Sequence, residues 1–197
     1  MRLLIMGPPG AGKGTQAGGV AAHYGIPAVS SGDLFRQHIK AQDAMGQKVS
    51  AIINRGEFVP DVITTSMIFR RLLSPDCLDG WLLDGYPRTL GQVEALDIVQ
   101  RERSTHLDAV ISLVADPSAL IGRMLKRAML EGRADDNEET ISRRIEVYNE
   151  ETEPVLAVYR ERGLIVEVDA LGDVGEVTKR LTDALDAKLA LDEGTRN

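Results

Sequence analysis

Residues 2–16, RLLIMGPPGAGKGTQ, join a short apolar run to a glycine-rich turn and then to a segment compatible with a helix. A strand that leads through such a turn into a helix is the context of a phosphate-binding loop. Glycine adopts backbone angles that leave successive N–H groups facing an anion, and a helix N-terminus adds to the attraction. Lys13 supplies a mobile positive charge for the β- and γ-phosphates. We therefore expect this loop to bind the phosphates of a nucleotide.

The loop departs at one position from the general pattern G-x-x-x-x-G-K-[ST]. Gly14 stands where a hydroxyl residue usually binds Mg²⁺, and Thr15 follows one residue later. The alternative interpretation is a plain Gly/Pro turn after a surface strand. The order of strand, turn and lysine favours phosphate binding.

The composition is that of an ordinary soluble protein. Of 197 residues, 43% are hydrophobic and 27% charged, which suits one domain. No apolar run approaches the roughly 20 residues needed to span a bilayer, and no signal peptide is visible, so we expect a cytoplasmic protein. The single cysteine, Cys77, excludes an internal disulfide and a cysteine-based structural zinc site. A net charge of −7 argues against a nucleic-acid or membrane partner.

Apolar runs and helix-compatible segments alternate along the chain. This alternation predicts an α/β fold with a doubly wound, five-stranded parallel sheet, in which ligands bind at the carboxyl ends of the strands. In a segment expected to be one long helix, residues 137–162, Asp136 and Glu139 have capping-box spacing and Pro154 should introduce a bend. The expected strands are 2–6, 26–30, 81–84, 108–114 and 164–169, and the expected helices are 13–24, 32–73 with breaks, 90–103, 117–129, 137–162 and 174–191.

Four motifs occur in a characteristic order: GPPGAGKGTQ at 7–16, SSGDLFR at 30–36, LLDGYPRTLGQ at 82–92 and GRADDNEETISRR at 132–144. Together they closely resemble the adenylate kinase family of nucleoside monophosphate kinases, over residues 1–185. The short segment at 126–136 is similar to the family's short-lid form, which lacks a zinc-bearing insert. The resemblance implies a P-loop NTPase three-layer fold in a single domain, residues 1–197. Its expected parts are a core (1–29, 60–125, 137–197), an NMP-binding insert (30–59) and a short lid (126–136).

The resemblance also implies an ATP site. The family's loop residues hold the ATP phosphates, two lid arginines meet the adenine and the phosphates, and a glycine after the last strand contacts the base. Asp84 resembles the family's aspartate in the Mg²⁺ shell, with contact through water. The corresponding ATP-binding residues are Gly10, Ala11, Gly12, Lys13, Gly14, Thr15, Arg123, Arg127 and Gly172.

An AMP site is implied in the same way. Arg36 and Arg88 would grip the AMP phosphate, a task suited to bidentate guanidinium contacts. Gln92 can offer a donor and an acceptor to the adenine edge. The implied set is Ser31, Arg36, Glu57, Phe58, Val59, Gly85, Tyr86, Pro87, Arg88, Gln92, Arg133 and Arg144.

The resemblance implies direct transfer of the γ-phosphoryl group of MgATP to AMP, giving two ADP, reversibly, by a monomer. Positioning and charge neutralisation would carry the catalysis, through Lys13, Arg88, Arg127, Arg133 and Arg144 with Mg²⁺. One alternative is a UMP/CMP kinase, which typically has Ala-Gly-Glu at 31–33 and Asn at 92. The other is a P-loop nucleotide switch, which would need an N-K-x-D run that the chain lacks.

Overall fold

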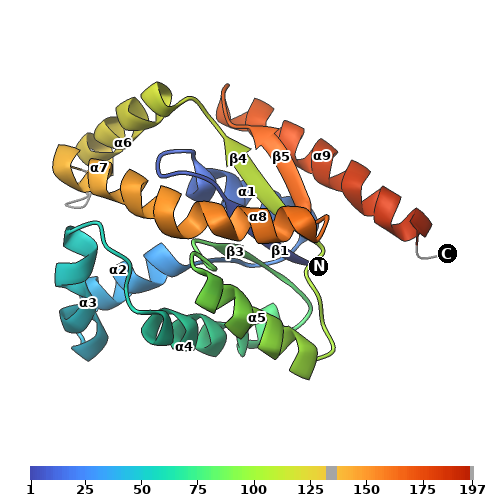
Figure 1. Ribbon diagram of the computed structural model, residues 1–197, viewed down its shortest axis with the longest axis horizontal. Coiled ribbons are helices and arrows are strands. Elements are labelled where there is room, and N and C mark those ends of the chain that lie inside the picture. The colour runs from blue at the N-terminus through green and yellow to red at the C-terminus, as the bar shows by residue number, and fades with distance from the viewer. Residues whose placement is uncertain (132–136, 196–197) are drawn as a thin grey trace.

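One parallel sheet forms the centre of the molecule in this computed structural model, which describes residues 1–131 and 137–195 (Figure 1). In this part of the chain the sheet has five strands in the order β2-β3-β1-β4-β5. All neighbouring pairs are parallel, with Ile5 of β1 opposite both Asp84 of β3 and Ile111 of β4. The strands are β1 Arg2–Met6, β2 Ala28–Ser30, β3 Trp81–Asp84, β4 Ala109–Val114 and β5 Ile165–Asp169.

Helices cover both faces of this sheet (Figure 1). A short 3₁₀ turn, η1 at Pro75–Cys77, precedes β3, and a π-helical turn, η2 at Tyr148–Thr152, lies between α7 and α8. The α-helices are α1 Lys13–Tyr24, α2 Ser31–Ala41, α3 Ala44–Asn54, α4 Asp61–Leu72, α5 Leu90–Glu102, α6 Pro117–Glu131, α7 Glu138–Val147, α8 Glu153–Glu161 and α9 Val174–Thr195. None of the helices in the described residues has the length and apolar character that crossing a bilayer requires.

Alternate side chains of the strands separate two apolar cores. Leu3 and Ile5 pack with α1, α6, α7 and α9 on one face, whereas Leu4 and Met6 pack with α4, α5 and α8 on the other. The central strands β1, β3 and β4 are buried on both faces, as parallel strands between two helical layers are, whereas the edge strand β5 alternates buried and exposed residues. A third, smaller cluster, around Phe35 and Val49, joins α2, α3 and α4. The observed architecture is therefore the three-layer α/β fold expected from the sequence.

The local differences from the sequence-based prediction have simple causes. Residues 138–161 are helical throughout, as expected, but the π-helical turn η2 separates α7 from α8 just before Pro154, which stands at the start of α8, where the missing N–H of proline is tolerated. Asp136, the first residue of the expected capping box, lies outside the described residues. Helix α7 begins at Glu138, so Asn137 is the N-cap and its Oδ1 accepts the Thr140 N–H at 3.0 Å.

The expected insert is described in full, and the expected lid in part. Residues 31–54 form α2 and α3, which pack on each other. Residues 126–131 of the expected lid belong to α6, and residues 132–136 lie outside the described residues.

Two adjacent glycines in α1 differ in what surrounds them. A Cβ atom on Gly18 would meet nothing within 4 Å, but one on Gly19 would lie 2.9 Å from Cγ2 of Thr178 in α9. Thr178 cannot move freely, because its Oγ1 donates to Gln16 Oε1 at 2.7 Å and a threonine is restricted at χ1. Gly19 therefore allows α1 and α9 to approach closely, whereas Gly18 has no such role.

This contrast predicts opposite effects of one substitution at neighbouring positions. Gly18→Ala should raise the free energy of unfolding by about 0.5–1 kcal/mol, the usual gain in helix propensity. Gly19→Ala should lower it, because the overlap with Thr178 outweighs that gain. Urea denaturation of the two variants and the wild type measures both. Stabilisation by both substitutions would contradict the packing role of Gly19.

Candidate active site

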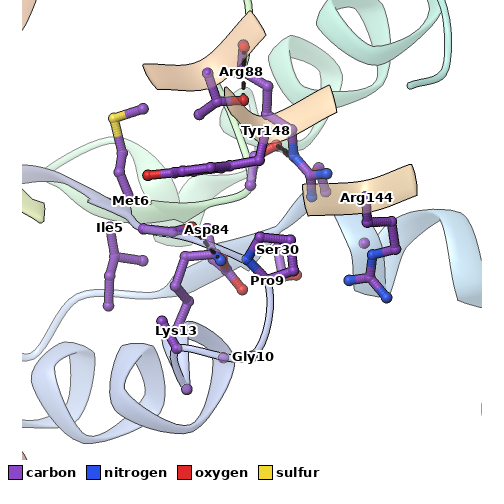
Figure 2. Close-up of a pocket in the computed structure, with 18 of the residues that line it drawn as sticks. Ile5, Met6, Pro9, Gly10, Lys13, Ser30, Asp84, Arg88, Arg144 and Tyr148 are labelled. Carbon is purple, nitrogen blue, oxygen red and sulfur yellow. Dashed lines mark hydrogen bonds between the residues drawn. The ribbon is translucent and has the colours of Figure 1, made fainter. Parts of the chain in front are cut away.

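A cavity of about 730 Å³ opens where the strands end, between the glycine-rich loop, α2 and the segment after β3. Figure 2 shows Lys13, Asp84, Arg88, Arg144 and Tyr148 around it. Most of the predicted site residues line the cavity: Gly10 to Thr15, Ser31, Arg36, Glu57, Phe58, Val59, Asp84, Gly85, Pro87, Arg88, Gln92, Arg123, Arg144 and Gly172.

Three predicted residues are not placed in the cavity. Tyr86 is 1% exposed in the core, where its hydroxyl contacts Thr65 Oγ1 at 3.2 Å and donates to the Gln92 carbonyl at 3.3 Å. Its burial raises the pKa of the phenol to about 12. Arg127 lies on α6, but its side chain is outside the described part of the structure, as is all of Arg133.

The glycine-rich loop has the backbone needed to surround an anion. Gly10 and Gly12 have φ values of 84° and 87°, which glycine adopts without strain, and Gly12 is the N-cap of α1. A Cβ on Gly10 would lie 2.7 Å from the Leu120 carbonyl oxygen, so close packing against α6 also requires glycine here. Lys13 Nζ donates to the carbonyls of Gly7 at 2.7 Å and Pro8 at 2.9 Å. These bonds hold the ammonium group over the loop.

Gly14 brings the start of α1 close to a carboxylate. Asp84, the last residue of β3, has its Oδ2 only 3.6 Å from the position that a Cβ on Gly14 would take. Any longer side chain at position 14 would fill the space beside this carboxylate. The described residues contain no group of three or more His, Cys, Asp or Glu side chains that could hold a metal ion. Asp84 therefore does not belong to a metal cage built from protein side chains, which suits Mg²⁺ held mainly by water and phosphate oxygens.

Arg88 is fixed from several sides. Its Nε donates to the Gly85 carbonyl at 2.8 Å, and its Cζ lies 5.1 Å from the centre of the Phe58 ring. Its backbone carbonyl accepts a hydrogen bond from Thr152 Oγ1 at 3.0 Å. A guanidinium group that is held in one orientation in this way is preorganised for bidentate contact with a phosphate.

The electrostatic surroundings of Arg88 favour an anion. Burial lowers the pKa of Arg88 to about 10, and the positive charges of Arg144 and Arg36 act in the same direction, against the opposing effect of Asp84. The group nevertheless remains protonated at neutral pH. A bound anion would offset both the desolvation and the repulsion among the three guanidinium groups.

Gly85 makes room for this arrangement. Its φ is +76°, and a Cβ there would lie 2.6 Å from both Arg88 Nη2 and Ser31 Oγ. Ser31 Oγ in turn donates to the Gly85 carbonyl at 2.7 Å. The turn after β3 thus needs glycine for its conformation and for its contacts with both neighbours.

The remaining charged side chains have protein partners. Arg36 pairs with Asp33, and Arg123 donates to the Ala170 carbonyl at 3.0 Å, close to Gly172 in sequence. Glu57 accepts a hydrogen bond from Arg55 at 2.8 Å, which holds the pKa of its carboxyl below the usual value.

Sequence reasoning missed Tyr148 and Thr152. Both belong to η2 and line the cavity, and the ring of Tyr148 points into it (Figure 2). Burial raises the pKa of Tyr148 to about 12, with a smaller contribution from the negative charge of Glu153, so the hydroxyl stays neutral. The sequence carries no signal for this role, because an aromatic residue in a long helical segment is indistinguishable from a core residue. Both side chains belong to a π-helical turn, an element that often occurs at functional sites.

Comparison with known proteins gives a consistent result. The family model described as adenylate kinase matches residues 5–164. A protein named adenylate kinase from Clavibacter michiganensis is 54% identical over 184 residues, which cover 93% of this chain and 92% of the relative. One from Nocardioides is 50% identical over 186 residues, covering 94% and 97%. One from Bifidobacterium longum is 47% identical over 186 residues, covering 94% and 100%.

The turn after β3 yields a prediction with a matched control. Gly85→Ala should lower the free energy of unfolding through backbone strain of about 1–2 kcal/mol and, in addition, through overlap with Arg88 and Ser31. Gly25→Ala has the first effect alone, because Gly25 has φ of +64° and a Cβ there would meet nothing within 4 Å. Urea denaturation compares the two. Equal destabilisation would contradict the close packing inferred at Gly85.

Proposed function

The chain belongs to the adenylate kinase family of phosphotransferases, and we propose that its cavity transfers the γ-phosphoryl group of MgATP to AMP, giving two ADP, reversibly. The observation that carries this proposal is the composition of one cavity. A phosphate-binding loop with Lys13 lines it together with the guanidinium groups of Arg36, Arg88 and Arg144. A site for one nucleotide would not need a second group of cations facing the loop.

The proposed donor is ATP, with its phosphates in the loop from Gly10 to Thr15. Lys13 would exchange its contacts with the loop carbonyls for contacts with phosphate oxygens. Arg123 and Gly172 would meet the adenine, and Arg127 the phosphates, as the family resemblance implies. The N-terminus of α1 adds its dipole at the same place.

The proposed acceptor is AMP, with its phosphate on Arg36 and Arg88. The acceptor oxygen is already an anion at neutral pH, so no serine, cysteine or histidine nucleophile is required. Catalysis then consists of holding the two phosphates in line and neutralising the charge that spreads over the transferred group. Lys13, Arg88, Arg127, Arg133 and Arg144 are the proposed cations.

Mg²⁺ is the proposed metal, and the site fits it. Asp84 is a single carboxylate beside the phosphate loop, with the small Gly14 leaving space next to it. When bound with ATP, Mg²⁺ would neutralise phosphate charge and orient the β- and γ-phosphates. The proposed role of Asp84 is to hold a water molecule of that ion.

Water must be kept from the transferred phosphoryl group. We propose that residues 30–59 close over AMP and residues 126–136 over ATP, which would desolvate the reaction and protect it from hydrolysis. The ring of Tyr148, which points into the cavity, would occupy space that water would otherwise fill.

We propose that the enzyme acts as a cytoplasmic monomer on free nucleotides, in nucleotide biosynthesis, with no nucleic-acid or membrane partner. The net charge of −7 supports this, because it disfavours polyanionic surfaces. The one cysteine, Cys77, is buried and unpaired, as is usual in a reducing compartment.

Arg88 provides a test of phosphate recognition. Arg88→Ala should reduce kcat/KM for AMP by about 10²–10³-fold, as expected when an electrostatic donor is lost from a transition state. Arg88→Lys keeps the charge but loses the planar fork, and should recover only part of the activity. The control is Arg160→Ala, at an exposed arginine that lines neither of the two cavities described. Full activity of Arg88→Ala in a coupled assay would contradict the assignment.

Acceptor specificity provides a second test. A coupled assay with AMP, UMP, CMP and GMP, each with MgATP, should give the highest kcat/KM for AMP. The residues at issue are Ser31-Gly32-Asp33 and Gln92, which differ from the pattern typical of UMP/CMP kinases. A tenfold preference for UMP would overturn AMP as the acceptor.

A further inference from the structure

The side-chain amide of Gln92 is held from both ends. Gln92 is 2% exposed but contributes to the cavity wall. Its Oε1 accepts the Arg88 backbone N–H at 2.8 Å, and its Nε2 donates to Asp61 Oδ1 at 2.6 Å. A backbone N–H can only donate, and an ionised carboxylate can only accept. The chemistry of the two partners therefore fixes which end of the amide is oxygen and which is nitrogen.

Asp61 is placed to act on Gln92 without reaching the cavity. It is the first residue of α4, and its Oδ2 accepts a hydrogen bond from Thr89 Oγ1 at 2.7 Å. Asp61 is not among the residues that line the 730 Å³ cavity, but it lines a separate cavity of about 550 Å³ with Thr89, Leu90 and Gly91. It thus contacts Gln92 from the side away from the proposed substrates.

The held amide keeps a defined hydrogen-bonding pattern. After its two protein contacts, one hydrogen on Nε2 and one lone pair on Oε1 remain. Adenine presents a donor, its 6-amino group, beside an acceptor, N1. Hypoxanthine has nearly the same shape but the opposite pattern, because its C6 oxygen accepts and its N1–H donates. An amide that could turn over would fit either base, whereas an amide fixed in one orientation fits only one of them.

We propose that Asp61 is a specificity-determining positioning residue, which fixes the amide of Gln92 in the orientation that pairs with adenine and excludes hypoxanthine. The inference rests on the proposed function, in which Gln92 reads the acceptor base. Turning the amide over would oppose its Nε2 to the Arg88 N–H and its Oε1 to the Asp61 carboxylate. Two hydrogen bonds would become two repulsive contacts, one of them with a charged group.

The test compares AMP and IMP as acceptors. Asp61→Ala removes one of the two constraints, so the ratio of kcat/KM for AMP to that for IMP should fall about tenfold, within the discrimination of one bidentate base contact. The change should lie mainly in KM for the acceptor, with KM for ATP within about twofold of the wild type. A uniform loss with both acceptors and with ATP indicates a general structural role and overturns the proposal.

Asp61→Asn is the matched variant. Its carbonyl oxygen can accept from Gln92 Nε2 while its amide donates to Thr89 Oγ1, so the orientation of Gln92 is retained. The ratio of AMP to IMP should therefore stay within about threefold of the wild type. A ratio as low as that of Asp61→Ala would show that the charge, and not the orientation, matters, and would overturn the proposal.

Two further variants keep the result interpretable. Gln92→Ala should lose the discrimination between AMP and IMP. If it does not, the base-reading role in the proposed function fails. If Gln92→Ala loses the discrimination while Asp61→Ala keeps the wild-type ratio, only the proposed role of Asp61 is contradicted. Should Asp61→Ala not fold, Gly91→Ala perturbs the same carboxylate at its other oxygen, because its Cβ would lie 3.1 Å from Asp61 Oδ2. Displacing the carboxylate should lower the ratio at least threefold, and an unchanged ratio would contradict the proposal.

Discussion

The burial of the Arg88 guanidinium group in a cavity that other cations also line is the constraint on which the site depends. The chain carries a net charge of −7, yet Arg36, Arg88 and Arg144 line the same cavity as Lys13. Burial and these neighbours lower the pKa of Arg88 to about 10. Concentrating like charges in this way is unfavourable unless an anion neutralises them. The fold maintains the arrangement by holding Arg88 to Gly85, Phe58 and Thr152, so that its geometry exists before a phosphate binds.

Arg88 also links the two parts of the proposed acceptor. Its side chain faces the phosphate position, while its backbone N–H fixes Oε1 of Gln92, the proposed reader of the base. Asp61 fixes the other end of the same amide, because its Oδ1 accepts a hydrogen bond from Gln92 Nε2. One short turn after β3 therefore positions both the proposed phosphate contact and the proposed base contact. A displacement of the turn, such as a Cβ on Gly85 would cause, should affect the two together.

Sequence alone predicted the parts of this structure that depend on local pattern. The apolar runs predicted the parallel strands, and the glycine-rich stretch predicted the loop, because both follow from local backbone and burial preferences. Three features of the structure could not be predicted from the sequence. Tyr148 lines the cavity from a π-helical turn within a long helical run. Asp61 meets Gln92 across 31 positions in sequence, and Gly19 meets Thr178 in another helix. Such contacts depend on tertiary packing, which a residue pattern does not encode.

In the proposed reaction, one cavity holds both phosphates and no side chain carries the phosphoryl group between them. The stereochemistry of transfer tests this directly. ATP made chiral at the γ-phosphorus with sulfur and oxygen isotopes would be reacted with AMP, and the configuration of the product determined. A single direct, in-line transfer predicts inversion at phosphorus. Retention would reveal a phosphorylated enzyme intermediate and would contradict direct transfer between the two nucleotides.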